Sequence, residues 1–171
     1  MQSKHRRNLS LTVLVSLFIT TGCASFLMPP IQPGEAESSV IAKLGQPTHR
    51  YADGNDHLLE YASGPWGQRT WMARIDSDGR LVSYRQVLNA DGFGTVDVGR
   101  SNKDDVLRKI GAPSETSYLP LVQQEVWSYY YKESGAWDSI MHVHFDQRGI
   151  VQRMLSGPNL RFDPDRQFPL R

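Results

Sequence analysis

The sequence predicts an α+β fold made of two tandem repeats, each a short helix, or two, followed by a three-stranded antiparallel meander. Two observations support this prediction. The chain contains VIAKLGQP at residues 40–47 and, 66 residues later, VLRKIGAP at residues 106–113. Each phrase is followed by segments in which apolar and polar residues alternate, as in half-buried strands. We therefore expect one duplicated unit, covering residues 31–88 and 96–155, whose copies pack as one pseudo-symmetric body.

Each repeat is expected to begin with a helix that ends at a glycine. In the second copy Val106 and Ile110 lie four residues apart on one helical face, and Ser101 with Asp104 has the pattern of a capping box. A glycine then supplies the left-handed conformation that ends a helix, and the following proline prevents its resumption. The shared structural residues are Gly34 and Gly99, Gly45 and Gly111, and Pro47 and Pro113. Because these phrases close a helix and do not open one, they do not predict a phosphate-binding loop.

The strands follow from alternation and from turn signals. In the second copy apolar residues at positions 141, 143 and 145 alternate with His142 and His144, and residues 71–75 repeat this pattern in the first copy. The turns DSDGR and DQRGI predict hairpins. The other expected strands cover residues 58–62, 81–88, 124–131 and 150–155. Segments 48–55 and 114–120 are expected to add a helical turn each, and residues 89–95 to link the repeats.

The first 22 residues have the layout of an export signal. Basic residues precede the apolar residues 9–19, a stretch too short to span a bilayer. The segment ends at ITTGCAS and resembles a bacterial lipobox, in which Cys23 becomes the lipid-modified N-terminus, although Thr20 stands where a leucine is usual. The resemblance implies an acylated Cys23 and, because Ala24 is not an aspartate, a location at the outer membrane facing the periplasm. A plain secretory signal with an incidental cysteine is the alternative.

The rest of the chain is nearly neutral in charge. Removal of residues 1–22 would leave 16 basic and 18 acidic residues, which is not the footprint of a nucleic-acid-binding protein. Residues 23–30 form a proline-rich tether that reaches about 26–29 Å when fully extended. The folded part is therefore expected to work close to the membrane surface. Residues 156–171 are rich in proline and charge and predict a loose C-terminal tail.

The sequence offers little for catalysis or for a cofactor. His142 and His144 share a strand face, as metal ligands do, but Met72 and Arg74 at the equivalent positions favour a solvated face. DSDG resembles the start of a calcium loop, but Val87 stands where the loop needs a glutamate, so a turn is expected. No nucleotide-binding or nucleophile motif occurs in the sequence. We expect no enzyme activity, cofactor, metal, small-molecule substrate or nucleic acid.

Each repeat also places a tryptophan two residues after a glycine, in SGPWGQ and in SGAWDS. Trp66 and Trp137 are candidates for contact with a protein partner, because tryptophan is favoured in binding hot spots. The alternative is that each indole folds over the edge of its own sheet as part of the core. The usual burial of large aromatic side chains favours this second interpretation.

The helix stop, the glycine before the helix, the aromatic strand and the D-x-x-G hairpin together resemble the SmpA/OmlA (BamE-like) outer-membrane lipoprotein family. The signature is carried by Gly34, Val40, Leu44, Gly45, Pro47 and Tyr61, and again by Gly99, Val106, Ile110, Gly111, Pro113 and Trp127. The resemblance implies a lipid-anchored protein that contacts envelope proteins, with the β-barrel assembly machinery as partner, in outer-membrane assembly or envelope integrity. The family's assembly factor has one such unit and this chain has two. Tandem units also resemble secreted β-lactamase inhibitors, which implies a periplasmic inhibitor as the alternative function.

Overall fold

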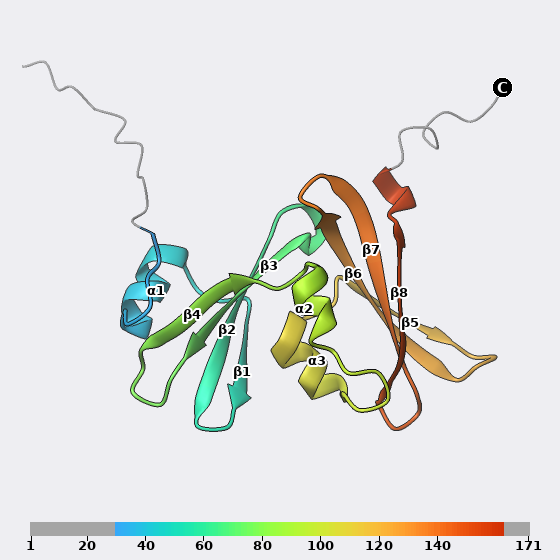
Figure 1. The fold of residues 1–171 in the computed structure, drawn as a ribbon, viewed down its shortest axis with the longest axis horizontal. Helices are drawn as coiled ribbons and strands as arrows, with labels where there is room; N and C mark the ends of the chain where they lie inside the picture. Colours follow the sequence, from blue (N-terminus) through green and yellow to red (C-terminus); the bar gives the residue numbers. More distant parts are fainter. Residues whose placement is uncertain (1–29, 163–171) are drawn as a thin grey trace, which may run out of the picture.

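The computed structural model describes residues 30–162, which form two four-stranded antiparallel sheets and a few short helices (Figure 1). The first half comprises α1 (Glu37–Leu44), β1 (His49–Asp53), β2 (Asp56–Ser63), β3 (Arg69–Ile75) and β4 (Leu81–Gln86). The second half comprises α2 (Ala90–Gly94), α3 (Lys103–Ile110), β5 (Glu115–Leu119), β6 (Gln124–Glu133), β7 (Trp137–Phe145) and β8 (Val151–Pro158). In both sheets the strands lie in sequence order, so each sheet is a meander.

The expected α+β class with three-stranded meanders is wrong, because strands dominate and each sheet has four. The segments expected to form helical turns instead contribute the edge strands β1 and β5. Asp53 pairs with Asp56 across the two-residue turn of Gly54 and Asn55, and a Gly-Asn pair in this position is a hairpin signal. In β5 all five side chains are exposed, so the strand has no apolar alternation by which to predict it.

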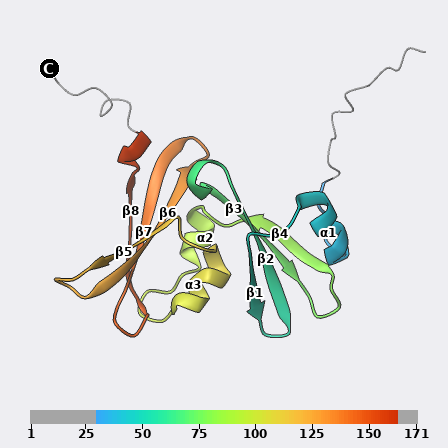
Figure 2. The same cartoon turned by 180° about the vertical axis from the view of Figure 1, so that it is seen from behind.

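The layers run in the order helix, sheet, helix, sheet (Figures 1 and 2). The helix α1 covers one face of the first sheet, and α2 and α3 lie between the two sheets. The expected pseudo-symmetric pairing of two repeats is therefore also wrong. The physical reason is that α3 has two contacting sides: Val106 and Ile110 pack on the second sheet, while its other side meets the first.

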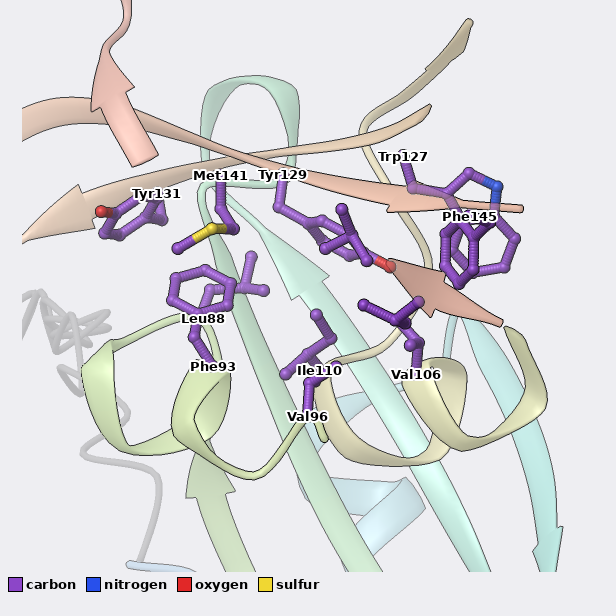
Figure 3. Close-up of a cluster of buried hydrophobic side chains, with 12 residues drawn as sticks. Leu88, Phe93, Val96, Val106, Ile110, Trp127, Tyr129, Tyr131, Met141 and Phe145 are labelled. Atoms are coloured by element: carbon purple, nitrogen blue, oxygen red, sulfur yellow. The ribbon is translucent and has the colours of Figure 1, made fainter. Parts of the chain in front are cut away.

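The larger hydrophobic core lies between α2, α3 and the inner face of the second sheet (Figure 3). Trp127 meets Phe145 edge to face at 4.8 Å between ring centroids, and Phe93 meets Tyr131 in the same way at 4.9 Å. Burial of each such side chain contributes roughly 1.5–3 kcal/mol. Phe93 belongs to α2, so residues 89–95 are not a plain linker but supply part of this core.

The strand ladders show which residues of the two halves correspond. When the two halves are aligned by the first residues of β1 and β5 and by their pairing partners, Tyr61 corresponds to Tyr129. The sequence alignment, which paired Tyr61 with Trp127, is wrong at this point. The four extra residues of the second half are divided between two hairpins. The β5–β6 hairpin contains two residues more than the β1–β2 hairpin, and the β6–β7 hairpin contains two residues more than the β2–β3 hairpin. Both ladders also shift register at the same place, immediately before Ile75 and before Phe145.

The helices end as the sequence predicts, but α3 begins differently. Gly45 and Gly111 follow α1 and α3 with φ of 85° and 84°, a region that glycine adopts readily. Asn102, not Ser101, is the N-cap of α3: its side chain accepts a hydrogen bond from the Asp105 N–H, and the Asp105 carboxylate accepts one from the Asn102 N–H. This is a complete capping box, shifted by one residue from the expected one.

The C-terminal part is more ordered than predicted. Within the expected loose tail, β8 continues to Pro158, and a 3₁₀ turn follows at Leu160–Phe162. Asn159 is buried and its N–H donates to the Asp138 carbonyl at 2.9 Å. The predicted export signal, Cys23 and residues 163–171 lie outside the described residues. Among residues 30–162, none of the helices has the length and apolar character needed to cross a bilayer.

Candidate functional site

Both tryptophans singled out by the sequence are exposed. Trp66 lies in a 3₁₀ turn between β2 and β3 and is 57% exposed, and Trp137 opens β7 and is 74% exposed. The interpretation of these indoles as core is therefore wrong for both. Trp66 has a φ of 60°, which is rare for a residue with a Cβ, and the Arg161 guanidinium lies 5.1 Å from its ring. This cation–π contact contributes about 0.5–1 kcal/mol at an exposed site.

A second apolar surface lies at the tip of the β5–β6 hairpin, residues 118–122, which sequence reasoning missed because it expected a helical turn there. Tyr118 is 59% exposed, Leu119 37%, Leu121 98% and Val122 55%. Figures 1 and 2 show this hairpin projecting from the end of the molecule opposite α1. We call these residues the apolar tip. The run SYLPLVQ was the available signal, since it places four apolar side chains around a proline.

The strand that leads into the apolar tip is an open edge. Within the described residues β5 pairs with β6 alone, and none of its five side chains is buried. The opposite edge of the same sheet is better protected, because Val151 of β8 exchanges backbone hydrogen bonds with Gly99 and Ser101. An exposed edge strand presents unpaired N–H and C=O groups that can bind another extended chain.

The outer face of the second sheet brings together a serine and a histidine. Ser128 Oγ and His142 Nδ1 lie 2.9 Å apart, and burial lowers the pKa of both His142 and His144. A hydroxyl beside a neutral imidazole is one part of a hydrolytic site. However, Ser128 lies in the middle of a ladder in which the β6 backbone pairs with β5 and β7, so the nearby N–H groups are not available as an oxyanion hole. We interpret the pair as a cross-strand contact.

The structure offers no metal centre among residues 30–162, where no three His, Cys, Asp or Glu side chains are grouped to hold an ion. His142 and His144 lie two residues apart on one face of β7, but no third potential ligand among residues 30–162 lies close enough to complete a metal site. The DSDG segment forms a hairpin turn. Its Asp76 carboxylate accepts hydrogen bonds from the N–H groups of Asp78 and Arg80, so the carboxylate stabilises the turn.

Glu60 joins the two halves and was not predicted. Its side chain is 1% exposed, and Oε2 accepts hydrogen bonds from the Tyr51 hydroxyl at 2.5 Å and from the Ala112 N–H at 3.0 Å. Burial, followed by the bond to Glu60, raises the pKa of Tyr51. The carboxylate thereby ties the first sheet to the turn that ends α3. The signal available in the sequence was a single acid within the apolar run LLEYA.

The motif residues have a structural role. The Gly34 N–H donates to the Leu81 carbonyl, and the Gly99 N–H donates to the Val151 carbonyl, each at 2.7 Å. Each bond ties the segment before a helix to the start of the last strand of its own half. These glycines, like those that end α1 and α3, belong to the fold and form no site.

Comparison of the chain with protein-family models, with curated proteins and with solved structures gives no match.

Proposed function

We propose that this protein is a non-enzymatic envelope lipoprotein, anchored to the outer membrane through Cys23, that binds another envelope protein through β5 and the apolar tip. The observation that carries the proposal is the exposure of the apolar tip, where Leu121 is 98% exposed. Contiguous exposed apolar side chains mark interaction surfaces in soluble domains. The neighbouring open edge of β5 supports the same conclusion.

The chemistry of this surface suits an extended segment of a partner. A strand added to a sheet edge gains affinity from backbone hydrogen bonds, and specificity from the side chains beside the edge. Here the apolar tip supplies those side chains, with Tyr118 as the aromatic residue of the kind that dominates binding energies. The β-barrel assembly machinery is the partner we propose, on the strength of the family resemblance stated above.

The position of the tip fits a membrane-anchored protein. The described chain begins at Pro30, next to α1, and the apolar tip lies at the opposite end of the molecule (Figure 1). An anchor at Cys23 would attach at the α1 end through a tether of about 26–29 Å. The tip would then stay available to a partner while the body remains near the membrane.

Affinity purification from detergent-solubilised membranes of the native host tests the proposal. Tagged wild-type protein is compared with Leu121→Asp and with Val82→Asp, an exposed valine of β4 that serves as a matched control. We expect barrel-assembly proteins with the wild type and with Val82→Asp, and at least a tenfold lower recovery with Leu121→Asp, the loss typical of a hot-spot residue.

A Cys23→Ala variant and mass spectrometry of the mature N-terminus test the anchor separately. Mature protein without acyl chains would contradict the anchored part of the proposal. Equal recovery with Leu121→Asp and Val82→Asp would contradict the tip as the binding surface. Recovery of a periplasmic enzyme in place of assembly proteins, retained by the Cys23→Ala variant, would favour the inhibitor alternative.

A further inference from the structure

A cleft of about 600 Å³ lies between the outer face of the first sheet and α3. Leu58 and Met72 line its apolar floor. Both side chains are almost fully buried, at 5% and 4% exposed, and pack with Val87. Both halves contribute to its walls: Arg74 and Arg85 come from the first sheet, and Arg108 and Lys109 come from α3. The cleft therefore exists because α3 separates the two sheets.

The walls carry more positive than negative charge. Four basic side chains line the cleft against two acidic ones, Asp53 and Asp105. Both acids are already occupied: Asp53 pairs with Arg74, and Asp105 pairs with Arg108 at 2.6 Å. The cleft thus keeps a surplus of donors for an anion.

Arg85 is the basic residue of the cleft that takes no part in these ion pairs. Arg74 and Arg108 are held by the two acids of the cleft, and the Lys109 ammonium lies 3.1 Å from Asp97 and 2.5 Å from the Thr95 carbonyl. Among the described residues no acidic group pairs with Arg85, which is exposed at the rim. A guanidinium in this state offers a complete fork of donors to a carboxylate.

We propose that this cleft binds an acidic peptide segment, with a glutamate or aspartate side chain on Arg85 and an adjacent apolar side chain on Leu58 and Met72. A simple anion would satisfy the guanidinium but would make no apolar contact with the floor of the cleft. A peptide in which the two kinds of side chain are neighbours meets both surfaces at once. The proposal rests on the cleft and not on the apolar tip, so either can fail while the other holds.

The test is a fluorescence anisotropy titration of full-length protein in detergent with a labelled peptide in which glutamate alternates with leucine. Arg85→Ala is expected to weaken the affinity at least tenfold, as loss of a charge-assisted hydrogen bond does. The matched control is Arg100→Ala, another exposed arginine, which lies in the segment before α3 and does not line the cleft. This control, like Leu121→Asp at the apolar tip, is expected to leave the affinity unchanged.

Two further readouts identify what the cleft recognises. A peptide with glutamine in place of glutamate is expected to bind at least tenfold more weakly, and inorganic phosphate is expected to compete poorly. In protein labelled with ¹³C at its methionine methyl groups, the acidic peptide is expected to shift the Met72 signal, assigned by its loss in Met72→Leu.

Three results would overturn the proposal. These are equal affinity of Arg85→Ala and Arg100→Ala, equal binding of the glutamine peptide, or a Met72 signal that the peptide leaves in place. Competition by phosphate as effective as that by the peptide would reduce the cleft to a general anion site, and would also overturn it. Weaker binding by Leu121→Asp alone would assign the peptide to the apolar tip.

Discussion

At the scale of the residue, Glu60 is a single side chain that links the two halves of the molecule. Its carboxylate accepts from Tyr51 in its own sheet and from the N–H of Ala112 in the other half. The side chain is 1% exposed, so in the folded protein its carboxylate takes the place of water as the acceptor for both donors. Removal of a buried acceptor costs about 1–3 kcal/mol for each donor left without a partner.

We therefore predict that Glu60→Ala lowers the free energy of unfolding by about 2 kcal/mol or more. Glu60→Gln keeps one acceptor oxygen and is expected to lose less. Urea unfolding followed by circular dichroism measures both. Asp78→Ala, in an exposed turn, is the control and is expected to stay within about 0.5 kcal/mol of the wild type. A loss for Glu60→Ala no greater than that for Asp78→Ala would show that the carboxylate does not stabilise the contact.

At the scale of the element, the two helix stops share one backbone conformation but have different surroundings. Gly45 and Gly111 have nearly the same φ and ψ. A Cβ on Gly45 would meet no heavy atom within 4 Å. A Cβ on Gly111 would lie 2.9 Å from Thr70 Cγ2 and 3.0 Å from the Glu60 carboxyl group, because this turn presses against the first sheet.

This difference predicts unequal costs for the same substitution. Gly45→Ala is expected to cost about 1–3 kcal/mol for the backbone conformation alone. Gly111→Ala is expected to cost a further 1–3 kcal/mol or so, because the buried Thr70 has no room to move away. Chemical denaturation of both variants gives the comparison. In the Thr70→Ser background, which lacks the methyl group, the extra cost at Gly111 should shrink. Equal costs for the two glycines would contradict the close approach.

At the scale of the whole molecule, the two halves are joined by more than the chain between them. Gln68 donates to Asp138 at 2.6 Å, and Ala112 donates to Glu60, so the first half binds the second at two separate places. The outer face of the first sheet also depends on α3 for cover. Without the second half, Leu58 and Met72 would lose α3 as a neighbour across the cleft and would be more exposed to water.

We therefore predict that the halves unfold in one transition. Trp71 packs in the core of the first half and Trp127 in that of the second. Two variants, each retaining one of these and carrying phenylalanine at the other three tryptophan positions, report on the halves separately. In each variant the fluorescence and circular dichroism midpoints in urea should coincide. Distinct midpoints within one variant would mean that the contacts between the halves are too weak to couple them.

The sequence by itself determined the local features of this protein. The helix stops at Gly45 and Gly111 and the hairpin turns at DSDG and DQRG lie where the sequence predicts them, since each depends on a few neighbouring residues. The Gly-Asn turn signal after β1 was also present, although a helical turn was expected there. The export signal and Cys23 are local patterns of the same kind, and they stay predictions.

Only the tertiary structure decided how these pieces are arranged. Glu60 and Ala112 are 52 residues apart, and no spacing in the sequence relates them. The same holds for Arg85 and the α3 residues that line the cleft, for the exposure of Trp66 and Trp137, and for β5, which is a strand because β6 lies beside it. Such contacts arise because α3 buries one side against the second sheet and its other side contacts the first sheet. Local sequence patterns do not predict this second contact, because it joins residues that are far apart in the chain.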